Sequence, residues 1–140
     1  MAKIINITEA VSIALHAMIL VAKKEGQLNV NEIADETTSS KFHIAKIMQK
    51  LVKDGFLISH RGPSGGFLLA KGADEITLLD IYESIEGKIQ VARCPLGKVR
   101  CPFGRCIFDD LTMKMTREFK EYLAERTLED YKKKHKPISI

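Results

Sequence analysis

Residues 39–70 read SSKFHIAKIMQKLVKDGFLISHRGPSGGFLLA, a helical pattern followed directly by the pattern of a hairpin. In the first half, apolar residues recur at the spacing of a helix, at Phe42, Ile44, Ile47, Met48, Leu51 and Val52. Ser39 or Ser40 can cap the start of this helix, and Gly55 suits the left-handed position after its end. In the second half, two short apolar runs flank GPSGG at 62–66, which predicts a β-hairpin with a loose tip.

Two more helices are expected before this stretch. Residues 7–24 place apolar side chains on one helix face, with Thr8 as a candidate cap and Glu9 favourable in the first turn. His16 is expected on the apolar side of this helix, as a core or dimer-contact residue. The run NVNE at 29–32 resembles a capping box and predicts a short second helix. Two short helices followed by a hairpin have the order of a winged helix-turn-helix, so we predict a mainly α fold with a small β-hairpin wing.

Two helices are also expected after the hairpin. Thr77 can cap a fourth helix that runs through Ile85 and stops at Gly87. After a loop, apolar residues again recur at intervals of three and four, at Phe108, Leu111, Met115, Phe119 and Tyr122. This spacing predicts a long amphipathic C-terminal helix with a charged opposite face, followed by a tail that frays at 132–137.

The composition is typical of a globular protein of one domain. The chain has 140 residues, of which 45% are hydrophobic and 29% charged. No apolar run approaches the ~20 residues of a membrane span, and no signal peptide opens the chain, so we expect a cytoplasmic protein with reduced thiols. A net charge of +4 is compatible with nucleic-acid binding. Because the sequence shows no phosphate-cradling glycine motif, nucleophile elbow or acid–base pair, we do not expect an enzyme.

The third helix and the hairpin carry the residues expected to contact DNA. Serine hydroxyls and helix N-terminal amides bind phosphate, lysine neutralises it, and a guanidinium beside a hairpin tip can enter a narrow minor groove. The predicted contacts are Ser39, Ser40, Lys41, His43, Lys46 and Lys50 on the helix, with Arg61 and Gly65 in the hairpin. Two alternatives remain, because lysines often form only the solvated face of a helix and helix-turn-helix shapes also bind proteins.

The chain has three cysteines, and all of them lie between positions 94 and 106. An odd number cannot pair completely, and the prolines and glycines around Cys94, Cys101 and Cys106 predict a loop. Thiolates are soft ligands for iron–sulphur clusters or zinc, and the neighbouring arginines and lysines favour the thiolate form. The spacing lacks the close cysteine pairs of structural zinc sites, and a fourth ligand must come from elsewhere. Thiol redox switching and buried free cysteines are the alternatives.

Taken together, these segments resemble the bacterial IscR/NsrR/CymR family of transcription regulators. The resemblance covers nearly the whole chain and rests on Ile33-Ala34, the helix at 41–55, RGPSGGFLL at 61–69, EITLLD at 75–80 and Glu86-Gly87. In that family the wing is a hallmark, the last long helix forms a homodimer, and the loop before it often carries three cysteines. The segment SKFHIAKIMQKL at 40–51 is closer to the nitric-oxide-sensing NsrR branch than to the IscR branch.

The resemblance implies an iron–sulphur cluster, [2Fe-2S] or [4Fe-4S], held by Cys94, Cys101 and Cys106. Two residues are candidates for the fourth ligand. Asp109 stands where IscR-like proteins have a histidine, and Glu9 matches an acidic residue that NsrR-like proteins donate from the partner subunit. Glu9 could equally be an acidic residue that stabilises its own helix N-terminus. The gaps of six and four residues between the cysteines depart from the more even spacing common in those branches.

The predicted function is that of a bacterial, cytoplasmic, homodimeric transcriptional repressor or activator. Its affinity for a palindromic double-stranded DNA operator would depend on the cluster, which senses nitric oxide, redox state or iron–sulphur status. The predicted layout is a DNA-binding domain at 1–87, a cluster-binding cysteine loop at 88–107, and a dimerisation helix with its tail at 108–140. The alternative is a cluster-free winged-helix regulator that responds to thiol oxidation or to a small-molecule effector.

Overall fold

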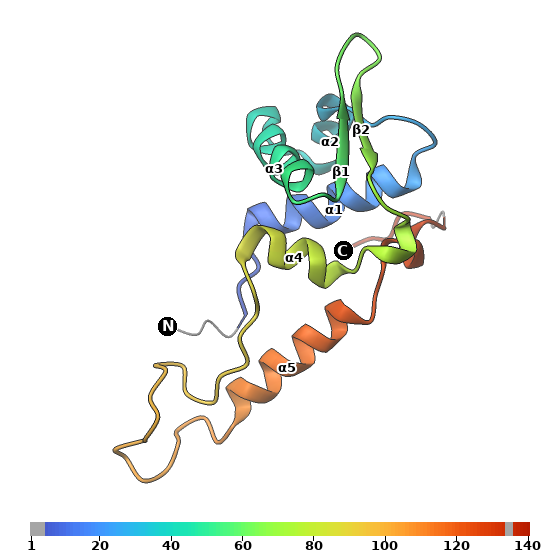
Figure 1. Ribbon diagram of the computed structural model, residues 1–140. Coiled ribbons are helices and arrows are strands. Elements are labelled where there is room, and N and C mark those ends of the chain that lie inside the picture. The colour runs from blue at the N-terminus through green and yellow to red at the C-terminus, as the bar shows by residue number, and fades with distance from the viewer. Residues whose placement is uncertain (1–4, 134–135) are drawn as a thin grey trace.

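The computed structural model describes residues 5–133 and 136–140, and Figure 1 shows the arrangement of its elements. The elements in chain order are α1 (Glu9–Lys23), α2 (Val30–Thr37), α3 (Lys41–Lys53), β1 (Leu57–His60), β2 (Gly66–Leu69), the 3₁₀ turn η1 (Ala73–Glu75), α4 (Leu78–Glu86), α5 (Leu111–Ala124) and the 3₁₀ turn η2 (Leu128–Tyr131). The two strands are antiparallel, with Leu57 opposite Leu69 and His60 opposite Gly66. The predicted mainly α fold with a β-hairpin wing is confirmed.

Polar caps fix where the helices begin. The Thr8 and Ser40 hydroxyls accept the backbone N–H groups of Val11 and His43, at the starts of α1 and α3. Reciprocal capping boxes, in which side chain and backbone bond in both directions, start α2 at Asn29 and α4 at Thr77. These caps satisfy N–H groups that have no partner within the helix. The capping predictions are confirmed, and Ser40 rather than Ser39 caps α3.

A single core lies around α1, which packs against α2, α3, α4, β2 and η2. We call this unit of α1 to α4, both strands, η1 and η2 the head. Its largest fully buried side chains are Val11, Met18, Ile33, Ile44, Met48, Leu51, Ile76, Ile81 and Leu128. His16 lies on the exposed side of α1, where its Nδ1 is 2.6 Å from the Ser12 carbonyl oxygen. The expectation that His16 could belong to the core is therefore wrong.

The hairpin is fixed to the head through Leu28, in the turn between α1 and α2. The backbones of Leu28 and Phe67 exchange two hydrogen bonds, with N···O distances of 3.1 and 2.8 Å. This close approach needs a glycine beside Phe67, because a Cβ atom on Gly66 would lie 2.7 Å from the Leu28 carbonyl oxygen. A Cβ on Gly65 would lie 2.5 Å from the His60 carbonyl oxygen. Both glycines therefore set the shape of the wing.

The last helix starts later than its apolar spacing predicts. Asp109 and Asp110 have left-handed φ angles of 44° and 67°, so the α-helix begins at Leu111 rather than at Phe108. Its buried side also differs from the predicted apolar stripe, since the buried residues are Thr112, Thr116 and Leu123. Phe119 joins this side, and its ring packs edge-on against Tyr82 of α4 at 5.4 Å between centroids. The stripe of Leu111, Met115 and Tyr122 remains exposed.

After α5 the chain returns to the head. Leu128 is fully buried, and its N–H donates to the Ile76 carbonyl oxygen at 3.0 Å. In return, the N–H of Leu78 donates to the Arg126 carbonyl oxygen at 3.0 Å. This contact joins residues far apart in the chain and has no local signal in the sequence. Residues 134–135 of the tail that is expected to fray lie outside the described part of the chain. Among the described residues, no helix is long and apolar enough to cross a membrane.

Candidate DNA-binding surface and cysteine site

The side of α3 that faces away from the core forms one candidate surface. Ile44, Ile47, Met48 and Leu51 are buried on one side of this helix. Helical spacing places five residues opposite them, which we call the outer face of α3: Phe42, Ala45, Lys46, Gln49 and Lys53. Lys41 and Lys50 flank this face and are exposed, as are Lys46, Gln49 and Lys53.

Phe42 corrects the sequence analysis. Its side chain is 76% exposed, so the assignment of Phe42 to the apolar core face of this helix is wrong. The ring lies under a positive charge, with the Lys46 Nζ 5.5 Å from the ring centroid. The sequence did contain the signal, because Phe42 is two residues before Ile44 and therefore out of phase with the buried positions.

The predicted DNA-contacting residues of α3 differ in their surroundings. Ser40 is committed to the helix cap, and the hydroxyl of half-buried Ser39 donates to the Thr37 carbonyl oxygen. The Lys50 ammonium bonds both carboxylate oxygens of Asp54 at 3.1 and 2.9 Å. Asp54 also accepts the hydroxyl of Ser84 from α4, and these two partners, Lys50 first, lower the pKa of its carboxyl. Lys50 is thus part of a link between α3 and α4.

The hairpin tip supplies the rest of this surface. Arg61 follows β1 directly and is exposed, and the N–H of Gly65 closes the turn on the Gly62 carbonyl oxygen at 2.9 Å. In Figure 1 the tip stands at the same end of the molecule as α2 and α3. An exposed helix face with lysines beside a hairpin that ends in an arginine is the arrangement that winged-helix proteins present to duplex DNA.

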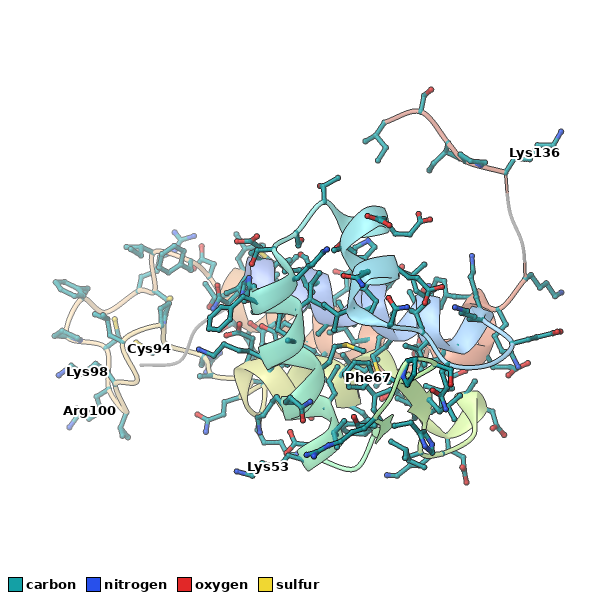
Figure 2. All side chains as sticks on the ribbon, turned by 90° about the horizontal axis from the view of Figure 1, so that it is seen from above. Lys53, Phe67, Cys94, Lys98, Arg100 and Lys136 are labelled. Carbon is teal, nitrogen blue, oxygen red and sulfur yellow. The ribbon has the colours of Figure 1, made fainter. Side chains whose placement is uncertain are left out.

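The cysteine loop, residues 88–107, lies at the other end of the molecule from the hairpin tip (Figure 1). In Figure 2, Cys94, Lys98 and Arg100 stand together, well away from Phe67 and Lys53 of the head. All three cysteines have free thiols and line one hollow of about 490 Å³. We call it the cysteine hollow, and its other lining residues are Arg93, Lys98, Val99, Gly104, Arg105, Asp109 and Asp110. The structure therefore brings together the three predicted cysteines and Asp109.

Backbone geometry around Cys94 favours its thiolate. The pKa of the Cys94 thiol is lowered from 9.0, first by the backbone N–H of Lys98 and then by that of Leu96, with further help from the Gly97 N–H and the Lys98 charge. A tight turn aims these groups, because the Gly97 N–H donates to the Cys94 carbonyl oxygen at 2.9 Å and Gly97 has a φ of 69°. Cys94 is thus prepared to carry negative charge, as a metal ligand or a reactive thiolate must.

Both aspartates of the cysteine hollow are engaged by arginines. Arg105 donates to the two carboxylate oxygens of Asp109 at 3.2 and 2.7 Å, and Arg93 donates to those of Asp110 at 2.6 and 3.1 Å. The pKa of Asp110 is lowered chiefly by Arg93, and that of Arg93 is raised mainly by Asp110 and slightly by Cys106. Each carboxylate oxygen of Asp109 already accepts one hydrogen bond from Arg105, so a metal would bind through the remaining lone pairs or displace Arg105.

Glu9 lies in a different hollow. It is exposed in the first turn of α1 and lines a space of about 630 Å³ together with His16, Lys23 and the turn between α2 and α3. The cysteines are not among the lining residues of this second hollow. Among the residues that the structure describes, no three His, Cys, Asp or Glu side chains are grouped closely enough to hold a single metal ion.

Comparison with known proteins identifies the fold and the class. The family model named Rrf2, described as an iron-dependent transcriptional regulator, matches residues 7–134. The HTH-type transcriptional regulator IscR of Pectobacterium atrosepticum is 27% identical over 125 residues, which cover 89% of this chain and 72% of the relative.

Solved structures agree with this match. CymR of B. subtilis, described as the global cysteine regulator, superposes with a TM-score of 0.76 at 28% identity and covers 91% of this chain and 96% of its own. The oxidized form of Staphylococcus aureus CymR gives 0.74 at 25% identity, covering 95% and 100%. IscR of T. potens shares the fold, with a TM-score of 0.70 at 23% identity over 90% of this chain and 85% of its own. The chain belongs to the Rrf2 family, whose members are transcriptional regulators and not enzymes.

Proposed function

We propose that this chain is a homodimeric regulator whose affinity for its operator is controlled by an iron–sulphur cluster bound to Cys94, Cys101 and Cys106. The observation that carries the proposal is that three reduced cysteines from one loop line a single basic hollow. In the proposed layout, residues 1–87 read DNA, residues 88–107 bind the cluster, and residues 108–140 form the dimer and the tail. The signal is nitric oxide, redox state or iron–sulphur status.

The donor set fits a cluster better than zinc. A single zinc ion needs its ligands to converge on one point, whereas several iron atoms allow the thiolates to stand apart. The gaps of six and four residues between the cysteines also lack the close cysteine pair that is typical of structural zinc sites. Three N–H groups aimed at Cys94 and the ammonium group of Lys98 can balance part of the negative charge of a cluster. When bound, such a cluster supplies iron that reacts with nitric oxide or oxygen.

For the fourth ligand we favour Glu9 of the partner subunit over Asp109. The carboxylate of Asp109 already accepts two hydrogen bonds from Arg105, and these reduce the negative charge that it can offer to a metal. Glu9 is exposed on the first turn of α1 and lies outside the cysteine hollow of its own chain. A carboxylate donated across a dimer would make the site depend on the arrangement of the two heads.

The proposed dimer surface is the exposed stripe of α5. Leu111, Met115 and Tyr122 lie at helical spacing on the side that the head leaves uncovered. Burying such a stripe against a second copy removes apolar surface from water. A symmetric dimer then presents two copies of α3 and of the wing, which suits a palindromic operator with half-sites one helical turn, or a multiple of it, apart.

A physical connection runs from the cysteine loop to α3 through α4. At the start of the loop, the N–H of Ile89 donates to the Glu83 carboxylate at 2.8 Å. The next residue of α4, Ser84, donates its hydroxyl to Asp54, the C-terminal cap of α3. We propose that a change in the cysteine loop shifts α4 and, through this bond, the orientation of α3.

The test is anaerobic purification followed by iron and sulphide analysis, and by DNA-binding assays before and after nitric oxide. We expect a coloured protein with visible charge-transfer absorption, and loss of bound iron in Cys94→Ser, Cys101→Ser and Cys106→Ser. Phe103→Ala, at a 79% exposed position of the same loop that does not line the cysteine hollow, is the matched control and should keep its iron. A colourless, iron-free protein after careful reconstitution would refute the cluster.

A second candidate function is a cluster-free regulator controlled by thiol oxidation. The lowered pKa of Cys94 favours it, because the thiolate is the form that oxidises, and so does the similarity to CymR structures, one of them in an oxidized form. Under this alternative, dilute peroxide changes the DNA affinity of metal-free protein, and Cys94→Ser removes the response. The cluster proposal instead predicts that metal-free protein is insensitive to peroxide in the same assay.

A further inference from the structure

The outer face of α3 has an aromatic ring near its N-terminal end. Phe42 is the second residue of the helix, and 76% of its side chain is exposed. Phenylalanine is among the residues most often buried, and an exposed ring on an otherwise polar helix face is more informative than an exposed lysine. Early residues of a recognition helix reach base edges in the major groove. The position of this ring near the start of α3, like its exposure, therefore indicates a contact with a base.

The ring forms one wall of a shallow hollow. Phe42, Ala45, Lys46 and Gln49 line a space of about 360 Å³ on this face. The Phe42 ring and the Ala45 methyl group are its apolar parts, while the Lys46 ammonium and the Gln49 amide are its polar parts. With its Nζ 5.5 Å from the ring centroid, Lys46 makes a cation–π contact with the ring.

The chemistry of the major groove selects what this hollow can hold. Adenine, guanine and cytosine present hydrogen-bond donors and acceptors there, and thymine adds the C5-methyl group as an apolar feature. A phenyl ring cannot form a hydrogen bond with the polar edge of a base. Its contact with such an edge would displace water from the polar atoms and leave them without a hydrogen-bond partner. We propose that Phe42 is a specificity-determining residue that contacts the C5-methyl group of a thymine in each operator half-site. This inference rests on the proposed DNA binding by α3.

The contact would complement those of the neighbouring lysines. Lys41 and Lys46 can bind phosphates, which holds the helix in place without distinguishing one sequence from another. An apolar contact to a methyl group does distinguish sequences, because it is lost wherever the thymine is replaced. The pairing of Phe42 with Lys46 on one helix face thus combines a sequence-reading group with a charge that strengthens binding to any DNA.

The test uses the full chain in two forms. One form is purified anaerobically and keeps any bound metal, and the other is stripped of metal, so that whichever form binds DNA is included. Each form selects duplexes from a random library, and every thymine of the selected duplex is then replaced in turn by deoxyuridine, which lacks only the methyl group. We expect one thymine per half-site at which uracil weakens wild-type binding by about fourfold, the effect of burying one methyl group. Phe42→Ala should bind the thymine and uracil duplexes equally, and Phe42→Leu should keep part of the preference.

Three results would overturn the inference. In the first, wild-type protein binds every uracil duplex as tightly as the parent duplex. This would rule out the thymine contact and leave the proposed function intact. Full discrimination by Phe42→Ala would assign the contact to another residue. Failure of both protein forms to enrich any duplex would refute DNA binding by α3 and the inference together. Thermal melting of Phe42→Ala should match wild type, since the ring is exposed.

Discussion

The head and the cysteine loop hold their shapes by different means. The head buries aliphatic side chains from α1, α2, α3 and α4 in one core, and each of these helices starts at a hydrogen-bonded cap. The cysteine loop exposes Leu96, Val99, Phe103 and Ile107, and it is held by turns and by two arginine–aspartate pairs at its ends. A segment with so little buried surface can change conformation at a small cost in free energy.

The rigid head and the exposed cysteine loop therefore suit different tasks. Docking on DNA needs α3 and the wing in a fixed relation, which the core and the Leu28–Phe67 bridge provide. The proposed sensing would need thiolates that a reagent can reach, and the cysteine loop is largely exposed. Each prediction below tests one side of this contrast.

The largest expected effect comes from the core. Leu51→Ala removes a fully buried side chain of α3 and should lower the free energy of unfolding by about 2–5 kcal/mol. Val99→Ala truncates a fully exposed side chain of the cysteine loop and should change it by less than about 0.5 kcal/mol. Urea unfolding followed by circular dichroism measures both. Equal effects would mean that the loop folds cooperatively with the head.

A smaller loss is expected at the junction where α1 begins. Thr8 caps α1 through the Val11 N–H, and its hydroxyl donates to the Glu86 carboxylate at the end of α4. Thr8→Ala should therefore cost about 1 kcal/mol in the same unfolding experiment. Thr8→Ser keeps the hydroxyl and is the matched control, with stability close to wild type. An alanine variant as stable as the serine variant would show that the cap contributes nothing.

Two lysines of α3 should differ in their contribution to DNA binding. Lys46→Ala should weaken binding and reduce the slope of log affinity against log salt by about 1. Lys50→Ala should have a smaller effect on the slope, because the Lys50 ammonium is already bonded to Asp54. Fluorescence anisotropy over a range of potassium chloride concentrations measures both slopes. The reverse order would mean that Lys50 leaves Asp54 when DNA binds.

The smallest effect concerns the reactivity of one thiol. In Cys101→Ser/Cys106→Ser, the remaining thiol has a folded-state pKa below its ordinary value of 9.0. Its thiolate therefore persists to lower pH in the folded chain, and the alkylation rate against pH should rise at lower pH than in urea-unfolded protein. By linkage, this group stabilises the fold above its unfolded pKa, and the contribution is lost as pH falls through the folded pKa. Coincident profiles would contradict the role of the Lys98 and Leu96 N–H groups.

Local signals in the sequence predict most of the fold. Thr8, Asn29, Ser40 and Thr77 cap helices where their spacing indicates, since a cap depends on residues within one turn. The start of α5 was placed too early because apolar spacing does not reveal the left-handed backbone of Asp109 and Asp110. Nor does it reveal the buried side of α5. There Thr112 and Thr116 satisfy their hydroxyls on backbone carbonyl oxygens, and so can be buried although they are polar.

The candidate sites are predicted in part. Thiol chemistry and spacing indicated the cysteine hollow, and the structure adds the N–H groups around Cys94 and the arginine partners of Asp109 and Asp110. Lys50 forms an ion pair with Asp54, and Asp54 also accepts a hydrogen bond from Ser84, which is 30 residues away along the chain. Such a long-range contact has no sequence signal of its own. The exposure of Phe42 differs from the prediction because its position is out of phase with Ile44, Ile47, Met48 and Leu51 on the helix.

The return of η2 to the head gives α5 one fixed end. Leu128 is buried beneath η1, whereas the start of α5 continues into the cysteine loop. The helix has 14 residues and is about 21 Å long, and it is held both at η2 and by the contact of Phe119 with Tyr82 of α4. A tilt of about 10° would move its loop end by roughly 4 Å, given that length. If two such helices pair in the proposed dimer, a rearrangement of the cysteine loop that tilted them would change the separation of the two heads.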